Sequence, residues 1–313
     1  MTGDPVMDWL LEGDPAIRWQ VMRDLLRWNA DRYGPERECV ATEGWGRQVL
    51  ARQDADGLWS GSLYNGKWTS TTYALYLLKV LGLPPGHPQA VNGCRRLLVS
   101  GLYQGHEIRF SRKATTADLG VTALVLSLCA YFGLQDDALP AMARHLIERQ
   151  EHGGNWLPND SPAASDYTFE TTLLVQEALA QCRGVLTGGP ADALREAVHK
   201  GHRFLLEHDL YLAAGNPIKA GWVSFSFPPY WFYDVLTVLD HLAAAGADPS
   251  PRAQKAVELV ESRRGSDGRW KLGTAHRGRI FFDMDVVGRP SRWNTLRALR
   301  VLDWWSGGGV TRG

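Results

Sequence analysis

Five carboxylates of this chain lie where they could transfer protons. Asp166 and Glu170 are four residues apart, so on a helix both would lie on one face. Asp234 directly follows a run of four aromatic residues, whose ring faces could stabilise a cation. Asp283 and Asp285 alternate, so on an extended segment both would point the same way. A carboxyl group desolvated in such surroundings can act as a general acid near neutral pH. Asp166 with Glu170 as its partner is the favoured acid.

Aromatic residues surround these acids in the sequence. The chain has 13 Trp in 313 residues, more than packing normally requires, although large core residues are an alternative explanation. One basic residue, Arg292, lies among the rings expected to contact a ligand. The predicted substrate-binding residues are Trp68, Tyr167, Trp222, Tyr230, Trp231, Tyr233, Arg292 and Trp293.

Structural roles compete with catalysis at each of these acids. Asp is a common helix N-cap, and a cap stabilises a helix by about 1 kcal/mol. Asp283 and Asp285 precede Arg289 and Arg292, with which they could form surface ion pairs. Solvated helix faces are the alternative for Asp166, Glu170 and Asp234.

Repeated turns indicate which elements would position these side chains. Residues 53–59 and 150–156 both read Gln-x3-Gly-x-Trp, and residues 264–270 repeat the frame with Arg in place of Gln. Each turn follows a helical pattern with one apolar stripe and precedes a helix that is apolar on most faces, which predicts an outer and an inner helix. The predicted inner helices begin near Thr71, Val121, Thr171, Asp234 and Asn294.

The same outer-then-inner order predicts the fold class. Further outer helices are expected near 90–99 and 194–206, and a sixth pair near 5–12 and 15–32. We therefore predict an all-α protein, a single (α/α)6 toroid of six helical hairpins with concentric rings, over residues 1–306, with a flexible tail at 307–313. Parallel inner helices would open all their N-termini at one mouth, which would gather the candidate residues.

The Gln-x3-Gly-x-Trp turns, placed between an outer and an apolar inner helix, resemble the QW repeat of the squalene cyclase and prenyltransferase superfamily. The resemblance covers residues 45–305. It implies an α/α toroid with an aromatic-lined central cavity, which in the cyclases holds a polyisoprenoid. It also implies that Gln53, Trp59, Gln150, Trp156 and Trp270 tie and cover helix ends.

This chain departs from the superfamily in the motifs that carry catalysis and zinc binding. Class II cyclases protonate their substrate with an acid of a DxDD motif, and the nearest string, Asp283-Met284-Asp285-Val286, lacks the last acid. Protein prenyltransferases bind zinc through Asp, Cys and His, and lanthionine cyclases through a Cys-His-Gly motif. Neither pattern occurs here.

Composition limits the partners. The 34 basic and 34 acidic residues balance, so neither nucleic acid nor an anionic membrane is an expected partner. No apolar run has the length of a spanning helix, and the start has no signal-peptide pattern. Four dispersed Cys favour reduced thiols and a cytoplasmic location. No cofactor and no metal are expected, because His199 and His202 lie on an outer helix without an obvious third ligand.

The functional hypothesis is that the toroid binds an apolar, isoprenoid small molecule in a central aromatic cavity and cyclises or isomerises it by carboxylate protonation. A non-catalytic ligand-binding toroid is the main alternative. A carbohydrate-active enzyme with paired carboxylates and Trp platforms is a third. The sequence leaves catalysis and the oligomeric state open.

Overall fold

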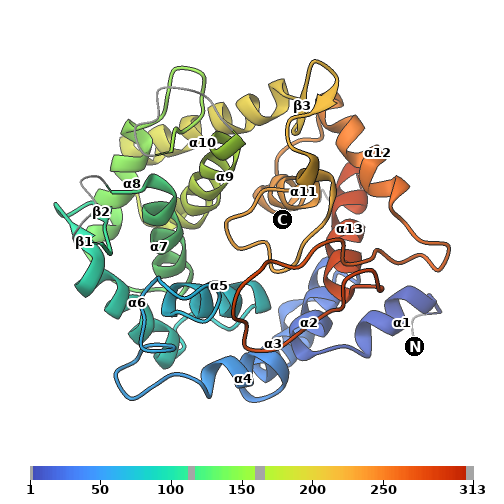
Figure 1. The fold of residues 1–313 in the computed structure, drawn as a ribbon, viewed down its shortest axis with the longest axis horizontal. Coiled ribbons are helices and arrows are strands. Elements are labelled where there is room, and N and C mark those ends of the chain that lie inside the picture. Colours follow the sequence, from blue (N-terminus) through green and yellow to red (C-terminus); the bar gives the residue numbers. More distant parts are fainter. Residues whose placement is uncertain (1–2, 112–116, 159–165, 308–313) are drawn as a thin grey trace.

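The computed structural model describes residues 3–111, 117–158 and 166–307, and helices dominate these residues. Figure 1 shows the helices arranged as a ring. The inner helices are α2 (Pro15–Asp24), α5 (Thr71–Leu81), α7 (Leu119–Tyr131), α9 (Asp166–Gln181), α11 (Val235–Ala245) and α13 (Arg292–Trp305). The outer helices are α1 (Pro5–Leu11), α3 (Ala30–Thr42), α4 (Gly44–Leu50), α6 (Pro88–Gly101), α8 (Ala138–Glu148), α10 (Gly189–Glu207) and α12 (Gln254–Ser262).

The ring closes where the first inner helix meets the last. Helix α13 packs against both α11 and α2. On the other side of α2, the indole N–H of Trp19 donates a hydrogen bond to the Leu81 carbonyl at the end of α5 (3.0 Å). The predicted all-α toroid is therefore confirmed, while the count of six hairpins remains a prediction.

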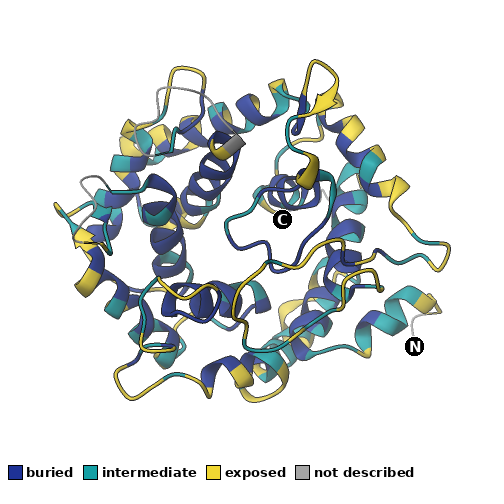
Figure 2. Cartoon of the chain, viewed as in Figure 1, coloured by how far each residue is buried: buried dark blue, intermediate teal, exposed yellow. Residues whose placement is uncertain are grey.

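Burial separates the inner from the outer helices. In α7 every residue from Thr122 to Cys129 is buried, whereas α12 buries only Ala256, Val257 and Val260 on one stripe. Figure 2 shows the same contrast around the whole ring. An inner helix packs on several sides and an outer helix on one, which is what their apolar patterns predict.

Three turns join an outer helix to an inner helix through a buried Trp. In each, the indole N–H donates to a carbonyl near the end of the outer helix, and the backbone N–H donates to a Thr hydroxyl of the inner helix, at 2.6 to 3.1 Å. The Trp residues with their carbonyl and Thr partners are Trp59 with Val49 and Thr71, Trp156 with Leu146 and Thr172, and Trp270 with Val260 and Thr295.

The Gln residues of two turns extend these ties to the next outer helix. Gln53 donates to the carbonyl of Gly57 in its own turn (3.0 Å) and to that of Gln89 in α6 (2.9 Å). Gln150 donates in the same way to Gly154 (2.8 Å) and to Ala197 in α10 (2.9 Å). Each Gln thus connects successive outer helices.

The N-terminal region differs from the expectation. A helix was expected over 15–32, but α2 ends at Asp24 and a separate helix, α3, begins at Ala30. Between them Arg27 adopts a left-handed backbone conformation (φ 53°), which interrupts the helix. The apolar spacing does not reveal such a break.

Two short antiparallel ribbons complete the described chain. They pair β1 (Leu102–Tyr103) with β2 (Glu107–Ile108), and β3 (Leu212–Ala213) with β4 (Asn216–Pro217). Among the described residues, no helix combines the length and apolar character needed to cross a bilayer. The expected tail lies outside the described residues from position 308 on.

Candidate functional site

A cavity of about 480 Å3 lies beside the first turns of α7 and α9. Small-molecule sites typically have volumes of about 300 to 1,000 Å3. We call it the apolar cavity, because most of its wall is formed by apolar and aromatic side chains. Its lining residues are Tyr64, Asp118, Gly120, Val121, Leu124, Pro158, Tyr167, Glu170, Thr171, Leu174 and Trp231.

Aromatic side chains from three loops pack together next to this cavity, and we call them the aromatic plug: Trp68, Tyr230, Trp231, Phe232 and His276. Tyr230 stacks on Trp68 with ring centroids 4.2 Å apart, and Phe232 stacks on both Trp231 (4.0 Å) and His276 (4.1 Å). Burial lowers the pKa of His276 to about 4, so its ring is neutral at pH 7. The loops that precede α11 and α13 extend over the ring in Figure 1.

The plug changes the expected site. Trp68, Asp166, Tyr230 and Trp293 were expected around one open mouth. Trp68 and Tyr230 are instead 2% and 5% exposed, and Trp293 stacks on Phe227 with centroids 4.2 Å apart. In the structure, stacked rings thus fill the expected mouth, and the apolar cavity lies to one side of them. Stacking buries large ring faces that an open mouth would expose to water.

Two described carboxylates line the apolar cavity. Glu170 is 4% exposed, and its Oε1 lies 3.3 Å from Nζ of Lys219. Asp118 caps α7, because its Oδ1 accepts a hydrogen bond from the backbone N–H of Val121 (3.0 Å). Asp166 begins α9, but its side chain lies outside the described part of the structure.

Tyr167 is the most exposed of the predicted ligand contacts that line the apolar cavity. Its side chain is 53% exposed, and Nζ of Lys219 lies 5.3 Å from the ring centroid. The ammonium of Lys219 is therefore close to both this ring and the Glu170 carboxylate.

Asp234 is a buried helix cap. Its Oδ1 accepts hydrogen bonds from the N–H and hydroxyl of Thr237 (2.7 and 2.8 Å), and its Oδ2 accepts from the N–H and hydroxyl of Ser226 (3.0 and 3.1 Å). These four bonds use the acceptor capacity of the carboxylate. Asp234 does not line the apolar cavity.

Asp283 and Asp285 do not face one direction as expected. Asp283 is exposed, while Asp285 is half-buried and accepts a hydrogen bond from the hydroxyl of Ser291 (2.7 Å), the residue that caps α13. Desolvation raises the pKa of Asp285. The segment is not a strand, so the alternation of a strand does not apply to it.

A second cavity, of about 320 Å3, lies inside the ring toward the C-terminal halves of the inner helices. We call it the charged cavity. Residues of α2, α5, α9, α11 and α13 all line it, together with Phe227 and Pro229. Its charged lining residues are Lys79, Glu177, Arg183, Asp240, Arg297 and Arg300.

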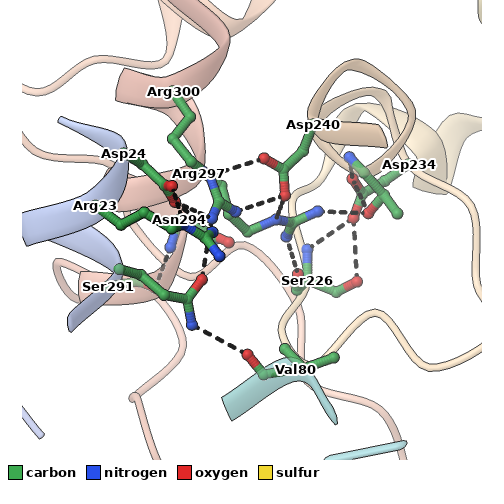
Figure 3. Close-up of polar contacts among 12 residues, drawn as sticks. Arg23, Asp24, Val80, Ser226, Asp234, Asp240, Ser291, Asn294, Arg297 and Arg300 are labelled. Carbon is green, nitrogen blue, oxygen red and sulfur yellow. Dashed lines mark hydrogen bonds and ion pairs between the residues drawn. The ribbon is translucent and has the colours of Figure 1, made fainter. Parts of the chain in front are cut away.

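An ion-pair network crosses the wall of the charged cavity, as Figure 3 shows. Asp240 binds Arg300 through both carboxylate oxygens (2.8 and 3.0 Å) and Arg297 through one (3.3 Å). Arg300 also donates to Asp24 (2.9 Å) and to Gln20 (3.0 Å). One guanidinium therefore connects three inner helices, α13, α11 and α2.

A second buried pair lies in the same wall. Nζ of Lys79 lies 3.9 Å from Oε2 of Glu177 and donates a hydrogen bond to the hydroxyl of Ser127 (2.6 Å). Burial raises the pKa of Glu177 and lowers the pKa of Lys79. This pair was not among the predicted site residues. The signal in the sequence is Lys79, the single charge of the otherwise apolar α5, because a buried charge is costly unless it is paired.

Three other predicted contacts, Trp222, Tyr233 and Arg292, lie in neither lining. Trp222 and Tyr233 pack on each other (centroids 4.5 Å apart) in the hydrophobic core. Arg292 donates to the Trp9 carbonyl (3.1 Å), and its guanidinium lies 4.5 Å from the Trp9 ring centroid. Trp293 lines the charged cavity.

The two histidines of α10 have different surroundings. His199 is exposed, whereas Nε2 of His202 lies 3.2 Å from Nε2 of His241 on α11. Burial lowers the pKa of His202 to about 4 and lowers that of His241 as well. Two neutral rings can share one N–H between them.

No protein-family model matches the chain. No curated protein matches it either. Among solved structures, the chain is similar to a protein from Actinoplanes (16% identity, 94% of this chain and 90% of that chain, TM-score 0.47). It is also similar to the type II terpene cyclase MstE from Scytonema (14% identity, 93% and 88%, TM-score 0.46), and to a variant of that cyclase in complex with geranylgeranyl dihydroxybenzoate (16% identity, 94% and 87%, TM-score 0.47).

Proposed function

We propose that the chain binds an apolar small molecule of the isoprenoid class in the apolar cavity. The observation that supports this most directly is the wall itself, in which Val121, Leu124 and Leu174 face a space of about 480 Å3. Tyr64 and Trp231 add aromatic faces. Removing an apolar ligand from water into such a space is favourable by about 25 cal/mol per Å2 of buried surface.

The two carboxylates that line the apolar cavity have partners within the protein, so they do not require a charged ligand. The Glu170 carboxylate contacts Lys219, and the Asp118 carboxylate caps α7. Both groups are therefore engaged within the protein. The resemblance of the three Trp turns to the QW repeat supports the isoprenoid class.

Cyclisation or isomerisation by protonation is the finer proposal. Asp166 and Glu170 are its candidate acids, four residues apart at the start of α9. The acid would donate its proton to an alkene carbon, the π electrons would form the new C–H bond, and the aromatic faces of Tyr64 and Trp231 would stabilise the carbocation. The contact of Glu170 with Lys219 is one that a binding protein needs no less than an acid catalyst, so the cavity supports binding more directly than protonation.

Two Val-to-Trp variants test the binding proposal. Val121 lines the apolar cavity, whereas Val99 on α6 is 76% exposed. Val121→Trp should fill the cavity and weaken the binding of farnesol or geranylgeraniol at least about tenfold, which corresponds to 1.4 kcal/mol. Val99→Trp should leave the affinity unchanged. Fluorescence titration and native mass spectrometry measure both.

Two outcomes would contradict the binding proposal. One is a wild-type protein that binds no isoprenoid alcohol, and the other is an equal effect of both variants. The finer proposal has its own readout: if the wild type converts an isoprenoid, Asp166→Asn or Glu170→Gln should lower turnover at least about 10²-fold. Binding without turnover would leave a non-catalytic ligand-binding protein.

A further inference from the structure

A group of metal-ligating side chains lies outside both cavities, where the β1–β2 ribbon meets α8. His106 ends the turn of the ribbon, Glu107 begins β2, and His145 lies in the last turn of α8. Their ligand atoms all lie within 4.8 Å of one another. The rings of His106 and His145 are 4.6 Å apart between centroids. Two imidazoles and one carboxylate thus converge from two separate elements.

An ordinary ion pair does not account for this arrangement. Nε2 of His145 lies 3.1 Å from Oε1 of Glu107, yet the two atoms do not form a hydrogen bond. That nitrogen is buried and has no other hydrogen-bond partner among the described residues. The side chains of His145 and Glu107 are only 14% and 20% exposed. A cation between the two atoms would satisfy both lone pairs, and His106 would supply a third.

The donor set selects the class of metal. Imidazole nitrogen together with carboxylate oxygen suits a divalent transition metal, whereas Ca2+ and Mg2+ favour oxygen ligands. Zn2+ binds His nitrogen and carboxylate oxygen at about 2.0 to 2.2 Å, and a site with three protein ligands keeps one position for water. Two such bonds at a tetrahedral angle place their ligand atoms about 3.3 Å apart. Small side-chain rotations would bring atoms now within 4.8 Å to that spacing.

We propose that His106, Glu107 and His145 bind one divalent transition-metal ion of the zinc type, which fixes the β1–β2 ribbon to α8. The site would also support the α7 end of the apolar cavity. The residue after Glu107, Ile108, donates its N–H to the hydroxyl of Thr122 on α7 (3.0 Å). The metal would therefore connect an outer helix to an inner one through the ribbon.

Zn2+ alone is the probe for this site. The full-length protein is stripped with a chelator, dialysed and titrated with Zn2+ by isothermal calorimetry. We expect one equivalent of Zn2+ to bind. His106→Ala and His145→Ala should each weaken binding at least about tenfold, because losing even a residue that only hydrogen-bonds to a metal ligand typically weakens binding about 10- to 100-fold. His152→Ala, which removes an exposed His that is not one of the three ligands, should leave the affinity unchanged.

A second measurement keeps the proposal testable if a His variant does not fold. Co2+ added to the wild type should give the intense visible absorption of a four-coordinate ion, and Glu107→Gln should reduce it. The proposal is overturned if the stripped wild type binds no Zn2+. It is also overturned if binding survives in both His variants, or if His199→Ala abolishes it, since that would place the ion on α10.

Discussion

The two cavities lie toward opposite ends of the inner helices, with α9 lining both, and their walls differ in charge. The apolar cavity adjoins the N-terminal ends of α7 and α9, and the charged cavity adjoins C-terminal halves. Helix N-termini favour acids and C-termini favour cations. Accordingly, Asp118 caps α7 at the first end, while Lys79 lies in the last turn of α5 at the other.

The two cavities differ in the partners of the side chains that line them. In the charged cavity the side chains of Asp240, Arg297 and Arg300 satisfy one another and connect helices. In the apolar cavity Val121 and Leu174 leave apolar surface for a ligand. The residues that line the charged cavity should therefore contribute mainly to the free energy of unfolding, and those that line the apolar cavity mainly to isoprenoid affinity.

The largest stability effect is expected at a Trp turn that supports the ring without lining either cavity. Trp156→Ala removes a fully buried ring and its indole hydrogen bond to the Leu146 carbonyl, so it should lower the free energy of unfolding by about 3 to 5 kcal/mol. Isoprenoid affinity per folded molecule should not change. Urea denaturation and ligand titration measure the two quantities, and an unchanged unfolding midpoint would refute the structural role.

The charged wall comes next. Asp240→Ala leaves the guanidiniums of Arg297 and Arg300 without their shared partner. This should lower the free energy of unfolding by about 3 kcal/mol, the lower part of the range for a broken buried ion pair, because Asp240 is 19% exposed. Asp192→Ala is the matched control. Asp192 pairs with Arg195 where both side chains are 70% exposed, so its loss should cost about 1 kcal/mol at most. Equal losses would erase the distinction between the two pairs.

The His202–His241 pair beside the charged cavity predicts a pH dependence. Burial lowers the pKa of His202 to about 4 and lowers that of His241, whereas an unfolded imidazole titrates near 6.5. Between these values the unfolded chain binds more protons than the folded chain, so stability should fall as pH drops from about 6.5 to about 4. In His202→Gln the fall should be smaller, and His152→Gln should match the wild type. Parallel curves in urea denaturation would contradict this prediction.

The smallest stability effect is expected in the apolar wall. Tyr167 is 53% exposed, so Tyr167→Ala should change the unfolding free energy by about 0.5 kcal/mol at most. The same variant should weaken isoprenoid binding about fivefold, since it removes a ring from the cavity rim. A large loss of unfolding free energy with unchanged isoprenoid affinity would contradict this prediction, because Tyr167 would then act in stability and not in binding.

Much of the fold could be predicted because it follows from local periodicity. The starts of α5, α7, α9, α11 and α13 all lie within five residues of their predicted positions. The break between α2 and α3 could not be predicted, because the left-handed conformation of Arg27 leaves no apolar signature. Less of the site was predictable. Glu170, Tyr167 and Trp231 do line one cavity, whereas Trp222 and Tyr233 are buried in the core.

The sequence by itself determined the layering of this protein, because the apolar period of each helix decides whether one side or several can be buried. It also determined the repeated turns, since Trp59, Trp156 and Trp270 make the same local contacts. Only the tertiary structure decided that loops fill the expected mouth with stacked rings. It alone brought Asp24, Asp240 and Arg300 into one network, because such contacts depend on ring closure between residues up to 276 positions apart. No local pattern encodes that distance.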